Sequence, residues 1–230
     1  NHAEMDGGGI YNNSSYHMIN CHFSGNSASE GGASYNHTGG AVITNSSFSG
    51  NVAISGEGGA FYSNFSQLNF QNCIIWNNQA EEAESTESES IHVTKRFSAP
   101  TASLSYSHNL IQHYHELGEG NINGTLAENE PRFVRYPSST DGDWLTKEDN
   151  DYGDLHLNET SPAINAGDNL ADPYLSEQSD VTMASLAMDV EQKDRIRGGT
   201  IDMGAYEFNF PRTLYESWAL ENGLIIDRKA

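Results

Sequence analysis

Two short sequence blocks recur together, in the same order, along the N-terminal part of the chain. The first block reads GGGIYN at 7–12, GGASYN at 31–36 and GGAFYS at 58–63. The second block reads NCHFSGN at 20–26, NSSFSGN at 45–51 and NCIIWNN at 72–78. Both blocks advance by about 25 residues, a unit too short to bury its own core, so successive units must stack on one another.

Within each repeat, apolar and polar residues alternate with the period of a β-strand. The direction of the alternation reverses across Asn20, Asn45 and Asn72. A one-residue bend there explains the reversal, because Asn tolerates the left-handed backbone. We favour a hydrogen-bonded ladder of these side chains over three separate turn residues. The inward positions are predicted to be Tyr16, Met18, Cys21, Phe23, Ala41, Ile43, Ser46, Phe48, Leu68, Phe70, Cys73 and Ile75.

Stacking of the repeats places equivalent residues in columns. Tyr11, Tyr35 and Tyr62 are expected to stack as aromatic rings. Cys21 and Cys73 share a column with one repeat between them, so their Cα atoms should lie roughly 9–10 Å apart, beyond the span of a disulfide. We therefore predict two buried free thiols. A second column of turn residues is expected at Asn26, Asn51 and Asn78.

The charge of the chain excludes several classes of partner. Its formal net charge is −21, with 11 Lys and Arg residues, and none precedes Lys95. Nucleic acid and anionic membrane surfaces require clustered cations, so neither is expected as a partner. Direct membrane insertion is not expected either, because the sequence has no long apolar stretch. The charge suits solubility in an extracellular setting; the alternative is cation binding by stacked carboxylates.

The second half of the chain carries a series of more specific motifs. They are SYSHNLIQ at 105–112, EPRFV at 130–134, GDLHL at 153–157, SPAINAGD at 161–168 and IDMGAYEF at 201–208. In this order they resemble the C-terminal region of "choice-of-anchor Q" proteins, which are secreted bacterial β-helices. The earlier repeats resemble those of polymorphic outer-membrane proteins. One departure concerns DVEQKDR at 189–195, which lacks the Gly usual in that turn of the family.

The repeats and this resemblance imply an all-β fold, the C-terminal portion of a right-handed parallel β-helix with an irregular cap, secreted or at the cell surface. We expect regular coils over 1–80, degenerate coils with an acidic loop over 81–135, a loop and capping region over 136–208, and an extension leading to an anchor over 209–230. Because the chain opens inside a repeat, earlier coils and an export signal are expected outside this sequence. The inward residues of the degenerate coils are predicted to be Ile91, Val93, Leu104, Tyr106, Leu110 and Ile111.

Three carboxylates are the candidates for chemistry. Asp6, Glu30 and Glu57 each precede a Gly-Gly pair, so they should stack along one edge with neighbouring carboxyl groups about 5 Å apart. That spacing would suit the nucleophile and acid of a retaining glycosidase, and it would equally suit a shared Ca²⁺ ion. The alternative is a set of solvated turn carboxylates that splay apart.

Two further groups of residues are candidate binding sites. Asp149, Asp151 and Asp154 place several oxygen ligands close together, in the manner of a calcium loop but without its full motif. The alternative is a polar turn. Exposed aromatic rings could stack on sugars, and packing within the cap is the competing explanation for them. The aromatic candidates are Trp76, Tyr114, Tyr136 and Trp144.

Two functions remain open at this point. The first is a structural or adhesive surface module that could bind polysaccharide or host-cell glycans. The second is a polysaccharide lyase or glycoside hydrolase on a β-helix scaffold, which rests on analogy between folds. We favour the module, because the repeats carry no Lys or Arg to neutralise a uronic acid and the chain has no nucleophile motif.

Overall fold

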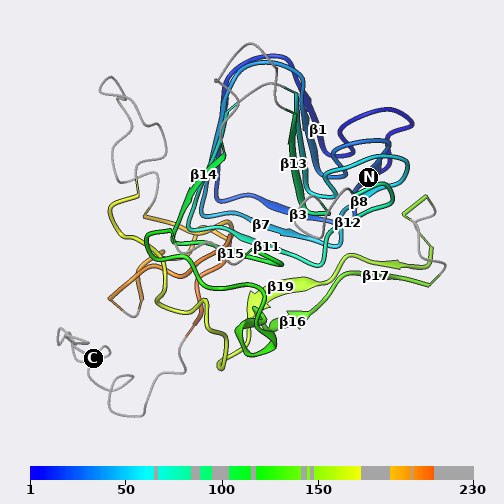
Figure 1. The fold of residues 1–230 in the computed structure, drawn as a ribbon. Coiled ribbons are helices and arrows are strands. Elements are labelled where there is room, and N and C mark those ends of the chain that lie inside the picture. Colours follow the sequence, from blue (N-terminus) through cyan, green and yellow to red (C-terminus); the bar gives the residue numbers. More distant parts are fainter. Residues whose placement is uncertain are drawn as a thin grey trace, which may run out of the picture.

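The computed structural model describes residues 1–64, 67–83, 89–94, 104–114, 118–140, 144–145, 148–171, 187–197 and 199–209. In it the chain is all-β, and strands of successive repeats stack in parallel sheets like those of a β-solenoid (Figure 1). One short 3-10 helix, η1 (Ala127–Asn129), is the only helix among the described residues. The predicted extension over 209–230 lies outside them, apart from Asn209.

Each coil contributes one strand to each of three parallel sheets. The first sheet contains β1 (Ile10–Asn12), β5 (Ser34–Asn36), β9 (Phe61–Asn64) and β13 (Ile91–Thr94). The second contains β2 (Tyr16–Ile19), β6 (Ala41–Thr44), β10 (Leu68–Gln71) and β14 (Leu104–Ser107). The third contains β3 (His22–Ser24), β7 (Ser47–Ser49), β11 (Ile74–Trp76) and β15 (Leu110–Ile111). A shorter fourth sheet contains β4 (Ser27–Ala28), β8 (Val52–Ala53) and β12 (Gln79–Ala80).

The register of the strands follows the repeat. Phe23 pairs with Phe48, and Phe48 pairs with Ile75, so equivalent residues occupy neighbouring layers of one interior column. The Phe23 and Phe48 rings are stacked with centroids 5.1 Å apart. This column belongs to an apolar core that runs through the coils, and the predicted alternation of inward residues in the repeats is confirmed.

The bends between the second and third sheets occur at the predicted asparagines. Asn20, Asn45 and Asn72 have positive φ angles of 51°, 48° and 54°. Asn72 Nδ2 donates to Asn45 Oδ1 at 2.9 Å, but Asn20 Nδ2 donates to the carbonyl of Met188 instead. The predicted ladder therefore joins two of the three residues, because a distant segment of the chain reaches the bend at Asn20.

The Gly-Gly pairs before the first sheet satisfy two steric demands. Gly31 has a φ of +63°, in the left-handed region that favours glycine. A Cβ atom on Gly32 would lie 2.3 Å from the carbonyl oxygen of Gly59 in the next coil. Adjacent coils approach so closely there that no side chain fits, which explains why the pair recurs in each repeat.

The two cysteines are free, as predicted. Cys73 is fully buried, whereas Cys21 is only half-buried. The difference arises because Cys21 lies in the first described coil, where a neighbouring coil covers it from one side. The prediction of two buried thiols is therefore correct for Cys73 and wrong for Cys21.

The third sheet is apolar on both of its faces at its last two strands, β11 and β15, whereas β3 and β7 carry His and Ser on the outer face. Ile75 and Ile111 point into the solenoid core, whereas Ile74 and Leu110 point outward into a second apolar cluster. Our prediction that Leu110 and Ile111 both face inward was wrong for Leu110, because successive residues of a strand point to opposite faces. A sheet of this kind requires cover on both sides.

The C-terminal region supplies that cover. It includes β16 (Phe133–Arg135) paired with β19 (Asp154–Leu157), and β17 (Ser138–Ser139) paired with β18 (Asn150–Asp151), both antiparallel. We expected residues 136–208 to cap the end of the stack. Among their described parts, Leu155, Leu157, Ala163 and Met203 pack on the outer face of the third sheet, and β19 lies below that sheet in Figure 1. Phe133, Leu155, Leu157, Ala163 and Met203 pack there on Ile74, Trp76 and Leu110.

Candidate functional site

The three candidate carboxylates stand at equivalent places in successive coils. The amide of Gly7 donates to the carbonyl of Glu30 at 3.0 Å, and the amide of Gly31 donates to the carbonyl of Glu57 at 3.2 Å. The residues that follow Asp6 and Glu30 are thus hydrogen-bonded to the acidic residue one coil further on. The backbone positions of Asp6, Glu30 and Glu57 therefore form the predicted column.

A row of aromatic rings runs along the first sheet. The ring centroids of Tyr11 and Tyr35 are 5.3 Å apart, and those of Tyr35 and Tyr62 are 5.0 Å apart, with nearly parallel planes. This confirms the predicted stack. His92 extends the row by one coil, 5.1 Å from Tyr62. Sequence reasoning missed His92, because it follows Tyr62 by 30 residues, outside the spacing of the repeats, and only the strand pairing places it opposite Tyr62.

The acidic column and the aromatic row interact electrostatically. Partial burial, together with the negative charges of Asp6 and Glu57, raises the pKa of Glu30. Burial and the charges of the same three carboxylates raise the pKa of Tyr62 to about 12. Glu57 Oε2 lies 2.8 Å from Nδ1 of His92. We call this surface the carboxylate–tyrosine face; it consists of Asp6, Glu30, Glu57, Tyr11, Tyr62 and His92, with the buried Tyr35 stacked between Tyr11 and Tyr62.

The chemistry of this face is that of an acidic hydrogen-bonding surface. Its carboxylates accept hydrogen bonds, and its tyrosine hydroxyls both donate and accept them. Because no Lys or Arg occurs before Lys95, the repeats supply no strong positive charge to attract an anionic ligand. A neutral or cationic ligand therefore fits this face better than a polyuronate does.

The four aromatic residues expected to bind sugars occupy packed positions instead. Trp76 and Trp144 are 8% and 6% exposed, respectively. Tyr114 packs against the solenoid core with its ring 5.5 Å from Tyr106, and Tyr136 packs 5.3 Å from Phe133. Trp76 and Trp144 are therefore too buried to be exposed stacking platforms, whereas Tyr114 and Tyr136 are partly buried and stay predictions.

The three aspartates predicted to bind calcium do not converge. Asp151 Oδ2 lies 2.7 Å from Nε of Arg135, and Asp154 Oδ1 lies 2.6 Å from Nδ1 of His156. The carbonyl of Asp149 accepts a hydrogen bond from Thr140. Within the described ranges, no group of three or more His, Cys, Asp or Glu side chains is placed to hold a metal ion. Arg135 and His156 thus pair with two of the three aspartates that were expected to bind calcium.

Another surface, at the second sheet, is concave. It is a shallow groove of about 260 Å³, and the described residues that line it include no Asp, Glu, Lys or Arg. Asn69 within it donates to Ser105 Oγ at 2.7 Å. The groove is lined by Ser15, Tyr16, His17, Gly40, Ala41, Val42, Gln67, Leu68, Asn69 and Ser105.

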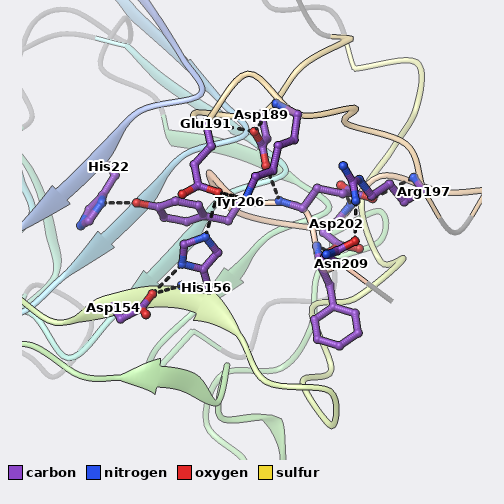
Figure 2. A network of polar contacts seen from close by, with 12 residues as sticks. His22, Asp154, His156, Asp189, Glu191, Arg197, Asp202, Tyr206 and Asn209 are labelled. Atoms are coloured by element: carbon purple, nitrogen blue, oxygen red, sulfur yellow. Dashed lines mark hydrogen bonds and ion pairs between the residues drawn. The ribbon is translucent and has the colours of Figure 1, made fainter. Parts of the chain in front are cut away.

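A polar network, which sequence reasoning missed, joins the C-terminal region to the solenoid (Figure 2). Tyr206 Oη lies 2.7 Å from Nδ1 of His22 on β3, and the ring of His156 packs on Tyr206 with centroids 4.1 Å apart. His156 Nε2 lies 3.1 Å from Glu191 Oε2. Burial, followed by the nearby positive charge of His156, lowers the pKa of His22.

A buried charge cluster lies beside this network. Arg195 is fully buried and donates to the carbonyls of Asp202 and Gly204. Burial raises the pKa of Asp202 to about 6 and that of Glu207 to about 8. The one signal in the sequence was the presence of Asp202 and Glu207 within the otherwise apolar motif IDMGAYEF at 201–208.

The fold and these surfaces define an all-β protein of stacked parallel strands. It has an acidic face, and a polar network joins its C-terminal region to the third sheet. Comparison with known proteins finds no matching family model and no match among curated proteins or solved structures. A search of the described residues for an apolar helix long enough to cross a membrane also finds none.

Proposed function

We propose that the chain is a right-handed parallel β-helix module of a secreted or cell-surface bacterial protein of the choice-of-anchor Q type. The parallel stacking of the repeats supports the solenoid. The order of the C-terminal motifs supports the family, and the net charge of −21 suits an extracellular setting. In this role the solenoid acts as a rigid scaffold that presents its outer faces to ligands.

We further propose that the ligand is a neutral glycan and that it binds along the carboxylate–tyrosine face. The observation that carries this proposal is the juxtaposition of the acidic column with the stacked row of Tyr11, Tyr35, Tyr62 and His92. Carboxylates and tyrosine hydroxyls repeat at the coil spacing of about 4.8 Å, so a linear chain of hydroxylated rings can hydrogen-bond to successive coils.

A glycan array followed by affinity measurements on the bound glycans tests this proposal. The triple variant Asp6→Asn, Glu30→Gln, Glu57→Gln is expected to weaken binding by at least about tenfold, because neutral amides replace charged acceptors. Asn69→Ala in the groove of the second sheet and Gln79→Ala on β12 serve as controls and should bind normally. Chelation of calcium should leave binding unchanged, since Asp151 and Asp154 are paired with Arg135 and His156.

Loss of binding in Asn69→Ala with normal binding in the triple variant would move the site to the groove. Failure of every neutral glycan to bind, while the protein remains folded, would contradict the proposal.

The second candidate function is hydrolysis of a neutral polysaccharide at the same face. The observation in its favour is Glu30, whose pKa is raised by burial and by the neighbouring carboxylates, as is typical of a general acid. An assay for release of reducing ends distinguishes the two functions. Turnover that is lost in Glu30→Gln would establish the enzyme, whereas glycan binding without turnover would support the module.

A further inference from the structure

His156 connects parts of the chain that are distant in the sequence (Figure 2). It lies on β19, where Nδ1 is 2.6 Å from Asp154 Oδ1, and its Nε2 is 3.1 Å from Glu191 Oε2. Its ring packs on Tyr206, which in turn contacts His22 of the solenoid. We call residues 187–197 and 199–209, which contain Glu191 and Tyr206, the C-terminal segment.

We propose that His156 is a pH-sensitive clasp, which in its protonated form holds the C-terminal segment against the third sheet and in its neutral form holds it less tightly. The role is independent of the proposed glycan binding, because the clasp and the carboxylate–tyrosine face lie on different sheets. The charged or titratable groups that face His156 are Asp154 of β19, Glu191 and Tyr206 of the C-terminal segment and His22 of β3, with Lys193 beside Glu191 and Arg135 beside Asp154.

The hydrogen-bonding geometry requires the protonated form. Both ring nitrogens of His156 face a carboxylate oxygen, and ionised carboxylates only accept hydrogen bonds. A neutral imidazole has a single N–H group, so it can donate to Asp154 or to Glu191 but not to both. Loss of the proton therefore leaves a lone pair opposite a negative charge and weakens one of the two connections.

The direction of the pH dependence follows from the same contacts. Burial alone would lower the pKa of His156, but the hydrogen bonds and charges of Asp154 and Glu191 raise it overall. The usual value in an unfolded chain is about 6.5, so the clasp is complete below that pH and is lost as pH rises through the higher folded value. The pKa values of Asp154 and Glu191 are lowered, so their contribution disappears only in stronger acid.

Contacts that do not titrate limit the change to part of the segment. The amide of Gly204 donates to the carbonyl of Asn72 at 2.8 Å, and the amide of Ala205 donates to Ser47 Oγ at 2.9 Å. These contacts keep the motif around Met203 on the third sheet at any pH. Loosening is therefore expected first around Glu191, next to the clasp.

Amide hydrogen exchange of the intact chain, corrected for intrinsic rates, tests the proposal between pH 6 and pH 9. The reporting amides are those of Asp189, Val190 and Arg195, which donate to carbonyls within the C-terminal segment. In the wild-type protein their protection should fall as pH rises through this range, because the folded protein loses a proton that it holds more tightly than the unfolded chain does. Amides of β6 and β10 in the solenoid should stay protected.

His156→Gln removes the titration, and His17→Gln on the outer face of the second sheet is the matched control. His156→Gln should show lower protection at pH 6 and a smaller fall with pH than the wild type, the remaining fall coming from Glu207, whereas His17→Gln should follow the wild-type curve. The proposal is overturned if wild-type protection is constant with pH, or if His156→Gln keeps the wild-type dependence. Should His156→Gln fail to fold, Glu191→Gln decides, because retention of the full pH dependence in that variant also overturns it.

Discussion

The side-chain amide of Asn51 donates a hydrogen bond of 2.8 Å to Oδ1 of Asn78, one coil further along the solenoid. Asn26 donates to Oδ1 of Asn51 over the same distance, so the three side chains form a continuous ladder. All three are buried. This ladder lies at the turn between the third and fourth sheets. It is more complete than the ladder that we predicted at Asn20, Asn45 and Asn72.

Removal of the central member of the ladder should be costly. Asn51→Ala removes the acceptor of the backbone amide and of one side-chain hydrogen bond of Asn26, and it removes one of the two donors to Asn78 Oδ1. Because the site is buried, the free energy of unfolding should fall by about 2–3 kcal/mol. Urea denaturation followed by circular dichroism measures the change. Asn158→Ala, at an exposed position, should alter stability by less than about 0.5 kcal/mol, and equal effects of the two variants would contradict the importance of the ladder.

The aromatic column in the core should respond in the same assay. Phe48 is fully buried between Phe23, with ring centroids 5.1 Å apart, and Phe61, with centroids 4.6 Å apart. Phe48→Ala should destabilise the protein by about 3–5 kcal/mol, because a rigid stack of coils cannot collapse into the cavity. Val134→Ala, where the side chain is 55% exposed, is the control. A loss below about 1 kcal/mol in Phe48→Ala would argue against this packing.

The two thiols should differ in reactivity. Burial raises the pKa of Cys73 to about 12, and it raises the pKa of the half-buried Cys21 by less. In the native protein a thiol reagent should therefore modify Cys21 first, and Cys73 only after unfolding. The labelling kinetics of Cys73→Ala and of Cys21→Ala then show which thiol is responsible for the fast phase and which for the slow phase. Rapid native labelling of Cys73 would contradict its place in the core.

The buried acid Glu207 should make stability fall as pH rises from about 4.5 to about 8. Its pKa is raised to about 8 by burial, followed by the charge of Asp202, so the folded protein holds this proton more tightly than the unfolded chain does. The resulting stability is complete below about pH 4.5 and is lost as pH rises through 8; between pH 7 and pH 9 the loss should be about 1 kcal/mol. Glu207→Gln should remove this part of the pH dependence. An unchanged dependence in that variant would show that other groups are responsible.

The repeats made the solenoid predictable, whereas the site was predictable only in part. Tyr11, Tyr35 and Tyr62 could be placed in one column because the same spacing that repeats in the sequence also sets the register of parallel strands. The predicted platforms Trp76 and Trp144 could not be placed, because whether an aromatic ring is exposed depends on which segment packs over it. The contact between His22 and Tyr206 spans 184 residues and carries no periodic signal.

By itself, the sequence determined which residues lie above one another in the coils. Gly-Gly, Tyr and Asn recur at one spacing, and backbone hydrogen bonding between parallel strands converts that spacing into columns. Only the tertiary structure decided which segments would cover the outer face of the third sheet. Ile74 and Leu110 need apolar cover that their own coils cannot provide. Met203 and Tyr206 supply this cover, and their fit depends on shape and charge complementarity between segments that are distant in the sequence.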